Sequence, residues 1–269
     1  MLPSLEVNEG LGKKPRVLVL EIRDRNKTDR GVIARLLVER EELYDRYADG
    51  QLRQARIELS YRMIGVAVAP ASGQGEFRGC YSATDNRVSV TASSVWEHGF
   101  VTLDLPGLEG QRVGTYLMNE IVRWARKWPD ADVNNIELLE GQAYKRNTAR
   151  RNRFYEQFGF TFDCMDAQHR AGMSHPVKVR DLKAVESWKD NIAERRMFDF
   201  LMEQADSHRA AQAEAGGLSR SLQDLIGERK REEAHPIWWA MWQVYYRRTN
   251  WVLGAALIAG AAALFHFAR

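Results

Sequence analysis

The sequence has few of the residues that mark secreted, metal-binding or nucleic-acid-binding proteins. Cys80 and Cys164 are the only two cysteines in 269 residues, which excludes a disulfide framework and fits a reducing compartment. Neither the cysteines nor the six scattered histidines have metal-ligand spacing, so we expect no metal. The formal net charge of +3 is too small to predict nucleic-acid binding. The opening residues, MLPSLEVNEGLGKK, are too polar for a signal peptide.

What is present indicates one folded domain with appendages. Hydrophobic residues make up 45% of the chain and charged residues 28%, as in globular proteins. Changes in composition predict five parts: an N-terminal tail (1–13), a folded domain (14–165), a charged amphipathic helical region (177–235), an aromatic juxtamembrane segment (236–250) and an apolar segment (251–268).

The apolar segment WVLGAALIAGAAALFHFA, residues 251–268, contains no Asp, Glu, Lys or Arg. As a helix it would be about 27 Å long, close to the hydrocarbon thickness of a bilayer. Aromatic residues and the pair Arg247 and Arg248 precede it, as at a membrane interface. A buried core helix is the other explanation. We predict a transmembrane tail anchor that leaves the preceding domain in the cytoplasm.

Within residues 14–165, strand-like and helix-like patterns alternate, which predicts an α/β fold of the α+β kind with a mixed sheet. Residues 31–47 have apolar positions at helical spacing, and two further helices are expected, one after the turn at residue 110 and one over 147–160, ending at Gly159. Strands are expected at residues 16–22, 55–70, 87–95, 99–105, 134–141 and 160–166.

The region 177–235 reads as two amphipathic helices. Trp188, Ile192, Phe200 and Leu201 give the first helix an apolar face, and Gly216-Gly217 is expected to separate it from the second. These helices could pack on the domain, pair with each other in a homodimer, or form a stalk. The sequence does not choose between these three arrangements.

The segment GQRVGTYL, which begins at Gly110, joins an expected strand to an expected helix. Glycines at 110 and 114 let a backbone approach a ligand closely. The amides of residues 112–116 lie at the helix start, where unpaired N–H groups and the helix dipole attract anions. A plain connection between two buried elements would show the same pattern, so the turn alone does not establish a site.

A second feature is a basic helix. It has Arg150, Arg151 and Arg153 beside Tyr155 and follows Lys145 and Arg146. A solvated basic face is the simpler explanation. However, two strand–helix units in succession place two helix N-termini at one sheet edge, where α/β proteins bind ligands.

The two features together resemble the GCN5-related N-acetyltransferase family. Gln111-Arg-Val-Gly114-Thr-Tyr116 is similar to the family's Gln/Arg-x-x-Gly-x-Gly/Ala motif. The stretch from Asn147 to Phe160 is similar to its second motif, an Asn-bearing helix that ends in Tyr-Glu-x-x-Gly-Phe. The order and separation of the motifs also match, over roughly residues 14–165. Two departures are Tyr116, where the family has Gly or Ala, and Asn147, which lies one residue farther from Tyr155 than usual.

The resemblance implies acetyl-CoA as donor and no metal. The pyrophosphate would lie on the motif amides, the pantetheine arm beside the preceding strand, and the departing thiolate would take a proton from the general acid Tyr155. The implied cofactor-binding residues are Leu103, Leu105, Gln111, Arg112, Val113, Gly114, Thr115, Tyr116, Asn147 and Arg150.

The general base is not identified by the motifs. Asp104 and Glu97 are the candidate carboxylates near the expected central strand, and for each an ordinary surface position is the other explanation. We therefore expect a membrane-tethered N-acetyltransferase that moves an acetyl group from acetyl-CoA to a primary amine of a protein or small molecule. The alternatives are a catalytically weak interaction module of the same fold, and transfer of a longer acyl group.

Overall fold

The computed structural model describes residues 16–65, 73–96, 99, 101, 103, 105–142, 147–164, 166–234, 236–238 and 240–246. The chain divides into two units, Met1–Met202 and Glu203–Arg269. The first unit contains both sheets and the candidate site, and the second contains most of helix α3 (Met197–Ala234).

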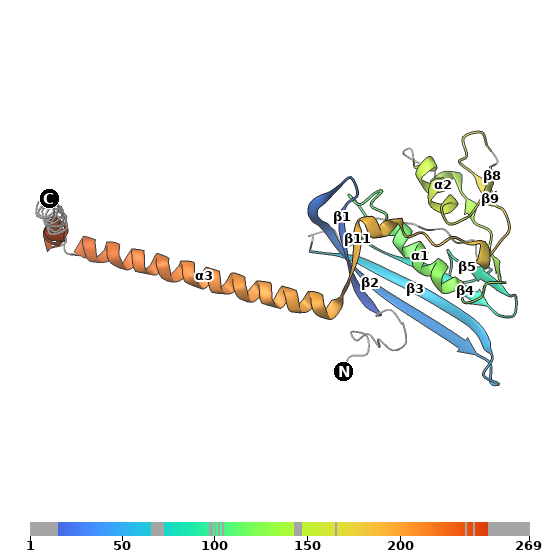
Figure 1. Ribbon diagram of the computed structural model, residues 1–269, viewed down its shortest axis with the longest axis horizontal. Coiled ribbons are helices and arrows are strands. Elements are labelled where there is room, and N and C mark those ends of the chain that lie inside the picture. Colours follow the sequence, from blue (N-terminus) through green and yellow to red (C-terminus); the bar gives the residue numbers. More distant parts are fainter. Residues whose placement is uncertain are drawn as a thin grey trace, which may run out of the picture. The chain divides into compact units, whose positions relative to one another are not determined.

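A large eight-stranded sheet dominates the first unit (Figure 1). Its order is β10-β6-β5-β4-β3-β2-β1-β11. All neighbours are antiparallel except β5 and β6, which are parallel. In chain order the strands are β1 (Val17–Asp24), β2 (Lys27–Arg46), β3 (Leu52–Ile64), β4 (Gln74–Ser82), β5 (Arg87–Ser89), β6 (Asp132–Val133), β10 (Val177–Lys178) and β11 (Ile192–Arg196).

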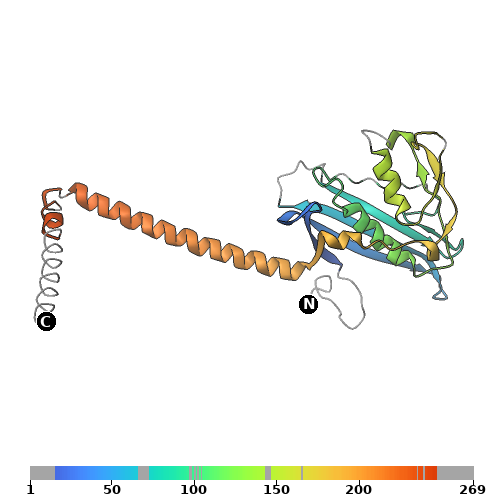
Figure 2. The ribbon, with the colours of Figure 1, turned by 45° about the horizontal axis from the view of Figure 1, so that its top comes forward.

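Helices and a smaller sheet complete the unit, and the predicted mixed α/β architecture is confirmed at this level. Helix α1 (Val113–Ala125) lies across one face of the large sheet, while α2 (Thr148–Glu156) lies beside the small sheet (Figures 1 and 2). The small sheet has the order β7-β9-β8. Its strands are β7 (Glu137–Leu138), β8 (Phe162–Cys164) and β9 (Gly172–Ser174), and short 3₁₀ turns cover Glu140–Gln142, Val179–Asp181 and Ser187–Asp190.

The core lies between α1 and the sheet. Leu117, Ile121 and Trp124 are spaced three or four residues apart on one face of α1 and are at most 1% exposed. They pack on the inward side chains of the central strands, among them Ile57 and Leu59 of β3, within the same hydrophobic cluster. Burying such a side chain contributes about 1.5–3 kcal/mol. This packing therefore holds the N-terminus of α1 in place.

The helix predicted for residues 31–47 is wrong, because this segment belongs to strand β2. Ala34, Leu36 and Val38 are buried at a period of two, whereas Ile33 is 43% exposed. Apolar residues on the outward face filled the gaps in that alternation and imitated helical spacing. The segment forms a strand because its backbone pairs with β1 on one side and with β3 on the other.

Other predicted elements are confirmed or corrected individually. The strands β1, β3 and β8 and the helices α1 and α2 form where they were expected. The strand expected at 87–95 is limited to β5, and the one expected at 134–141 is limited to β7. The strand expected at 99–105 is wrong at its described positions, since Gly99, Val101, Leu103 and Leu105 carry no strand. Strand β6 pairs with β5 instead.

The helix expected to start at 177 is also wrong. Residues 177–196 form β10, two 3₁₀ turns and β11, and β11 pairs with β1 at the edge of the large sheet. Trp188 and Ile192 are 4% and 3% exposed because they pack into this unit's core. The compact unit thus runs to Met202 instead of ending near residue 165. Helix α3 continues through Gly216-Gly217, where a break was expected.

The predicted membrane anchor is not tested by the structure. Among the described residues, no helix has both the length and the apolar character that a membrane crossing requires. The segment 251–268 lies outside the described residues.

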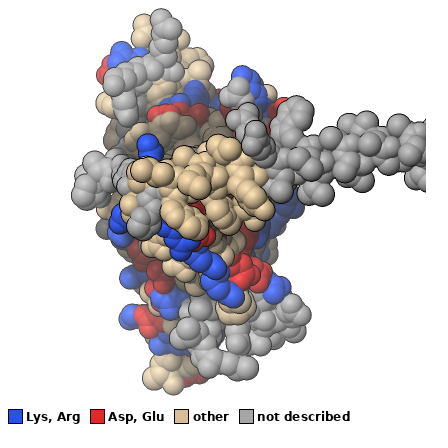
Figure 3. All heavy atoms as spheres, turned by 90° about the vertical axis from the view of Figure 1, so that its left-hand side faces the viewer, with Lys and Arg blue, Asp and Glu red and all other residues tan. Residues whose placement is uncertain are grey.

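Charged side chains of both signs lie on the face drawn in Figure 3, where Lys and Arg are interspersed with Asp and Glu around an uncharged region. Exposed ion pairs of the sheet include Arg78–Glu58 (3.1 Å) and Arg16–Glu39 (2.9 Å). Each such pair contributes about 0–1 kcal/mol. These pairs place both signs of charge side by side at the surface of the first unit.

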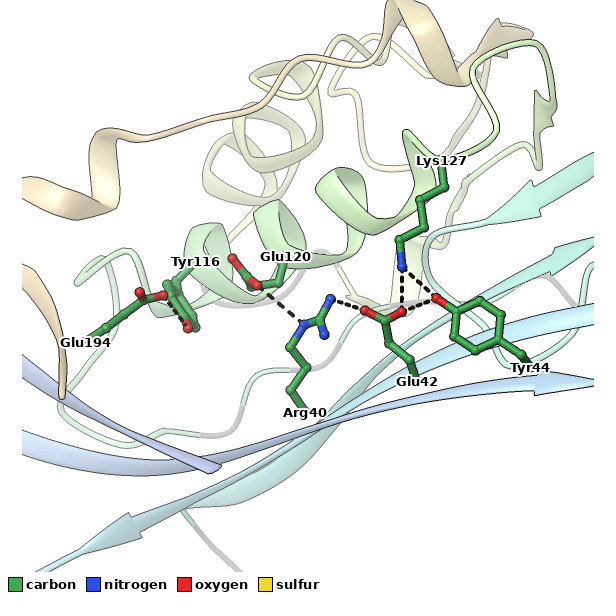
Figure 4. Close-up of polar contacts among 7 residues, drawn as sticks. All are labelled: Arg40, Glu42, Tyr44, Tyr116, Glu120, Lys127 and Glu194. Atoms are coloured by element: carbon green, nitrogen blue, oxygen red, sulfur yellow. Dashed lines mark hydrogen bonds and ion pairs between the residues drawn. The ribbon is translucent and has the colours of Figure 1, made fainter. Parts of the chain in front are cut away.

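A chain of polar residues crosses the interface between α1 and β2 (Figure 4). Arg40 of β2 lies 3.6 Å from Glu120, which is 3% exposed, and also pairs with Glu42. Lys127 donates to Glu42 (2.5 Å) and to the hydroxyl of Tyr44 (2.6 Å). Burial alone would raise the pKa of Glu42, but hydrogen bonds from Lys127 and Tyr44 and the charge of Arg40 lower it overall. The network ties α1 to the sheet by charge as well as by apolar packing.

Candidate functional site

A cavity of about 550 Å³ lies at the N-terminus of α1. Most of its lining comes from the segment 101–105 with the glycine turn that follows, the first residues of α1, and α2 with Asn147 before it. Arg25, Phe77 and Ser187 complete the lining. Its walls combine apolar side chains such as Leu103 and Phe154 with arginines. An extended ligand with an anionic end and an apolar end would fit such walls.

The turn before α1 presents free backbone amides. Gly110 has φ = 81° and Arg112 has φ = 64°, so the chain reverses through two left-handed residues just before the helix. Within the described chain, no backbone hydrogen bond uses the amides of residues 113–115, whereas Tyr116 N–H already donates to the Arg112 carbonyl (3.0 Å). Three N–H groups and the positive end of the helix dipole are therefore available to an anion.

Gly114 is constrained by its neighbours. A Cβ at this position would lie 3.3 Å from the ring of Phe154 and 3.6 Å from the side chain of Leu103. A side chain here would fill the narrow space between α1 and α2 that the cavity uses. This requirement explains a glycine at the second position of α1, where propensity alone disfavours it.

Five arginines and one acidic residue, Glu109, line the cavity. Arg151 is buried, and its guanidinium donates to the carbonyls of Leu139 and Arg170, both at 2.8 Å, so its role is structural. Burial also lowers the pKa of Arg151. Arg112 pairs with Asp190 at 2.5 Å.

The remaining arginines are Arg25, Arg150 and Arg153, and all three are exposed. The Arg150 Nε donates to the Asn147 side chain at 2.9 Å. Within the described chain, the guanidinium groups of Arg25 and Arg153 make no hydrogen bond or ion pair. These two are the cations of the cavity that can take a phosphate without giving up a partner among the described residues.

Tyr155 lies in an aromatic pocket at the cavity wall. It is 4% exposed, and its ring contacts those of Phe154, Phe160 and Phe162 edge-on. Burial raises the pKa of Tyr155 to about 12, against the opposing effects of a hydrogen bond with the Val101 backbone and the charge of Arg151. The phenol keeps its proton at neutral pH, as an exposed tyrosine also does, and its raised pKa makes it a weaker acid than an exposed tyrosine.

Most of the sequence-predicted cofactor residues meet at this cavity. Its lining includes Leu103, Leu105, Arg112, Val113, Gly114, Thr115, Asn147, Arg150 and Tyr155. Leu103 and Leu105 contribute as loop residues and not as a strand.

Gln111 and Tyr116 are not among the lining residues. Gln111 accepts a hydrogen bond from the Arg25 amide at 2.8 Å. Tyr116 is 1% exposed and donates to Glu194 of β11 at 2.8 Å (Figure 4). Its ring also packs edge-on against Trp188. Its bulk, which departs from the family motif, fills space under β11 and does not narrow the cavity.

The candidate bases are not located, because Glu97 and Asp104 lie outside the described residues. Among the residues that the structure does describe, no group of three or more His, Cys, Asp or Glu could hold a metal ion.

Sequence reasoning did not place Arg25 or Phe154 at the site. Arg25 reaches the cavity from the turn between β1 and β2. No local sequence pattern marks Arg25 as a site residue. The turn that carries it was not expected, because the segment that follows was predicted to be a helix. Phe154 lies four residues before Phe158 on α2, which indicates a core face, although its ring is only partly buried and borders the cavity.

Comparison with known proteins adds no assignment: no protein-family model matches the chain, and no curated protein matches it.

Proposed function

We propose that the chain is an N-acetyltransferase of the GCN5-related kind, which transfers an acetyl group from acetyl-CoA to a primary amine and is tethered to a membrane by residues 251–268. The observation that carries the proposal is one cavity bordered by the free amides of α1, the arginines of α2 and the protonated Tyr155. The resemblance of the two sequence motifs supports the same reading.

The fit of donor to cavity follows from charge and polarity. A pyrophosphate needs several N–H donors and compensating cations, which residues 113–115, Arg25 and Arg153 supply. The pantetheine arm is mostly apolar with two amides, and it would lie along Leu103 and Leu105. The thioester would then reach Tyr155, which borders the same cavity.

In the proposed reaction, the nitrogen of a neutral amine bonds to the acetyl carbon and the carbon–sulfur bond breaks. The departing sulfur takes the proton of the Tyr155 hydroxyl. A base must remove the proton from the attacking nitrogen, and Glu97 and Asp104 remain the proposed carboxylates for that step. Tyr155 recovers a proton from solvent to complete the cycle.

Calorimetric titration of the full-length protein with acetyl-CoA tests donor binding. Arg153→Gln removes an unpaired cavity cation and should weaken binding roughly tenfold. Arg56→Gln, at an exposed position of β3 outside the cavity lining, is the matched control and should leave the affinity unchanged. Absence of binding at millimolar acetyl-CoA would refute the proposal.

Turnover is tested by release of free CoA in the presence of a panel of primary amines. Tyr155→Phe should bind acetyl-CoA normally and turn over at least about 100-fold more slowly. An interaction module would instead keep its cellular phenotype with Tyr155→Phe and lose it when residues 203–269 are deleted. The deletion should start at Glu203, because β10 and β11 belong to the first unit.

A further inference from the structure

The segment between the small sheet and α3 makes direct contact with the proposed anion site. Ser187, in the 3₁₀ turn Ser187–Asp190, lines the cavity. Its carbonyl and the Asp190 carboxylate both accept hydrogen bonds from Arg112. Ser187 therefore forms part of the site and Asp190 holds one of its arginines, although both lie outside the two sequence motifs.

Asn191 is a buried polar residue at the end of this segment. Its side chain is 3% exposed. Its Nδ2 donates to the carbonyl of Gln111 at 3.0 Å and to the carbonyl of Arg23 at 3.2 Å. Its own carbonyl accepts from the Arg23 amide at 2.8 Å. One buried amide group thus connects the glycine turn to the end of β1.

A second tie closes this junction. The Gln111 side chain accepts a hydrogen bond from the backbone amide of Arg25. The junction therefore fixes the turn between β1 and β2, which carries Arg25, against the turn that presents the amides of residues 113–115. Both turns are parts of the proposed phosphate-binding site. The pair Asp24 and Lys27 closes the turn between β1 and β2, and the Gln111 hydrogen bond adds a contact from that turn to the glycine turn.

We infer that Asn191 is a positioning residue for phosphate binding: it holds the glycine turn and Arg25 at the distance that a pyrophosphate group requires. The inference rests on the proposed function and names a residue that neither motif contains. Asn191 does not border the cavity, so its effect is transmitted through Gln111 and Arg23. Preorganised donors bind an anion more tightly than mobile ones because no ordering entropy is lost on binding.

The test compares two donors with Asn191→Ala in the full-length protein. Acetyl-CoA carries the pyrophosphate and acetyl-pantetheine does not. Calorimetry should show acetyl-CoA binding weakened roughly tenfold, while a titration with acetyl-pantetheine followed by NMR should show unchanged affinity. A purely structural role would weaken both ligands alike and would overturn the inference.

The matched control is Asn119→Ala. Asn119 is also fully buried, and its Oδ1 accepts from the Val185 amide at 2.9 Å, so it ties α1 to the same segment away from the cavity. Both alanine variants should lower the melting temperature, but only Asn191→Ala should lose acetyl-CoA affinity.

A second variant covers the case in which Asn191→Ala does not fold. Gln111→Met removes the exposed tie to Arg25 and should weaken acetyl-CoA, but not acetyl-pantetheine, in the same way. Equal acetyl-CoA affinity in the wild type and the folded variants overturns this inference alone. Absence of binding in the wild type overturns the proposed function and the inference with it.

Discussion

At the scale of single residues, Tyr155 shows how packing prepares a side chain for chemistry. A phenol surrounded by three other aromatic rings is poorly solvated, so its charged form is disfavoured. The same burial that keeps the proton on the hydroxyl fixes the ring at the cavity wall. In the proposed reaction, its proton would go to a leaving group in the cavity.

The raised pKa of Tyr155 predicts an effect on alkaline stability. The unfolded chain loses this proton near pH 10 while the folded chain keeps it until about pH 12, so stability falls as pH rises between these values. Two pKa units correspond to roughly 3 kcal/mol. Urea unfolding measured between about pH 9 and about pH 11.5 should show a smaller loss of unfolding free energy for Tyr155→Phe than for the wild type.

Tyr47→Phe is the control for that measurement, because Tyr47 is 46% exposed. Its pH dependence should follow the wild type. Parallel curves for the wild type and Tyr155→Phe would show that the buried phenol does not titrate as described.

At the scale of elements, the N-terminus of α1 and the body of α1 have different roles. Its N-terminus forms the cavity, and its body is attached to β2 by the polar chain from Arg40 to Lys127 (Figure 4). Charges at such an interface are costly when one partner is removed, because the other remains desolvated.

Arg40→Met should therefore destabilise the first unit by roughly 2–4 kcal/mol, since Glu120 would keep its burial and lose the cation 3.6 Å away. The double variant Arg40→Met, Glu120→Gln should recover part of that loss. Urea unfolding midpoints measure both effects.

The exposed pair Arg78–Glu58 supplies the comparison for this interface. Arg78→Met should change stability by less than about 1 kcal/mol. If Arg40→Met costs no more than Arg78→Met, the polar chain does not hold α1 to the sheet.

The elements also show what the sequence could reveal. The helices α1 and α2 were predictable because a glycine turn precedes the first and a basic cluster marks the second. In α1, Leu117, Ile121 and Trp124 also repeat at helical spacing. Strand β2 was not, because Ile33 and Leu37 on its outer face obscure the period of two. The cavity was predictable in its motif residues. Arg25 reaches the cavity, and Asn191 supports the turn beside it, through tertiary contacts that no local pattern encodes.

At the scale of the whole molecule, the chain joins a folded unit to an exposed helix and, as proposed, to a membrane segment. Large apolar residues of α3 such as Leu218, Leu222 and Leu225 are 59–67% exposed. The membrane proposal depends on residues 251–268.

Vesicle flotation tests that proposal. The full-length protein should rise with lipid vesicles even at high salt, because about 18 apolar residues can span the bilayer. A chain that ends at residue 246 should stay at the bottom. Full-length protein that remains at the bottom would contradict the anchor.

The position of β11 has a consequence for how the protein is made. Strand β1 is synthesised first among the strands, yet its outer edge pairs with β11, the last strand to be made. Arg23 and Asn191 are 168 residues apart, and translation at about 5–20 residues per second separates them by roughly 10–30 seconds. For that time the nascent chain carries an open sheet edge, which invites unwanted pairing. Gln111 is made 80 residues before Asn191, so the glycine turn lacks this contact for roughly 4–16 seconds. If the proposed function holds, a ribosome-bound chain would bind acetyl-CoA weakly until the last strand has been added.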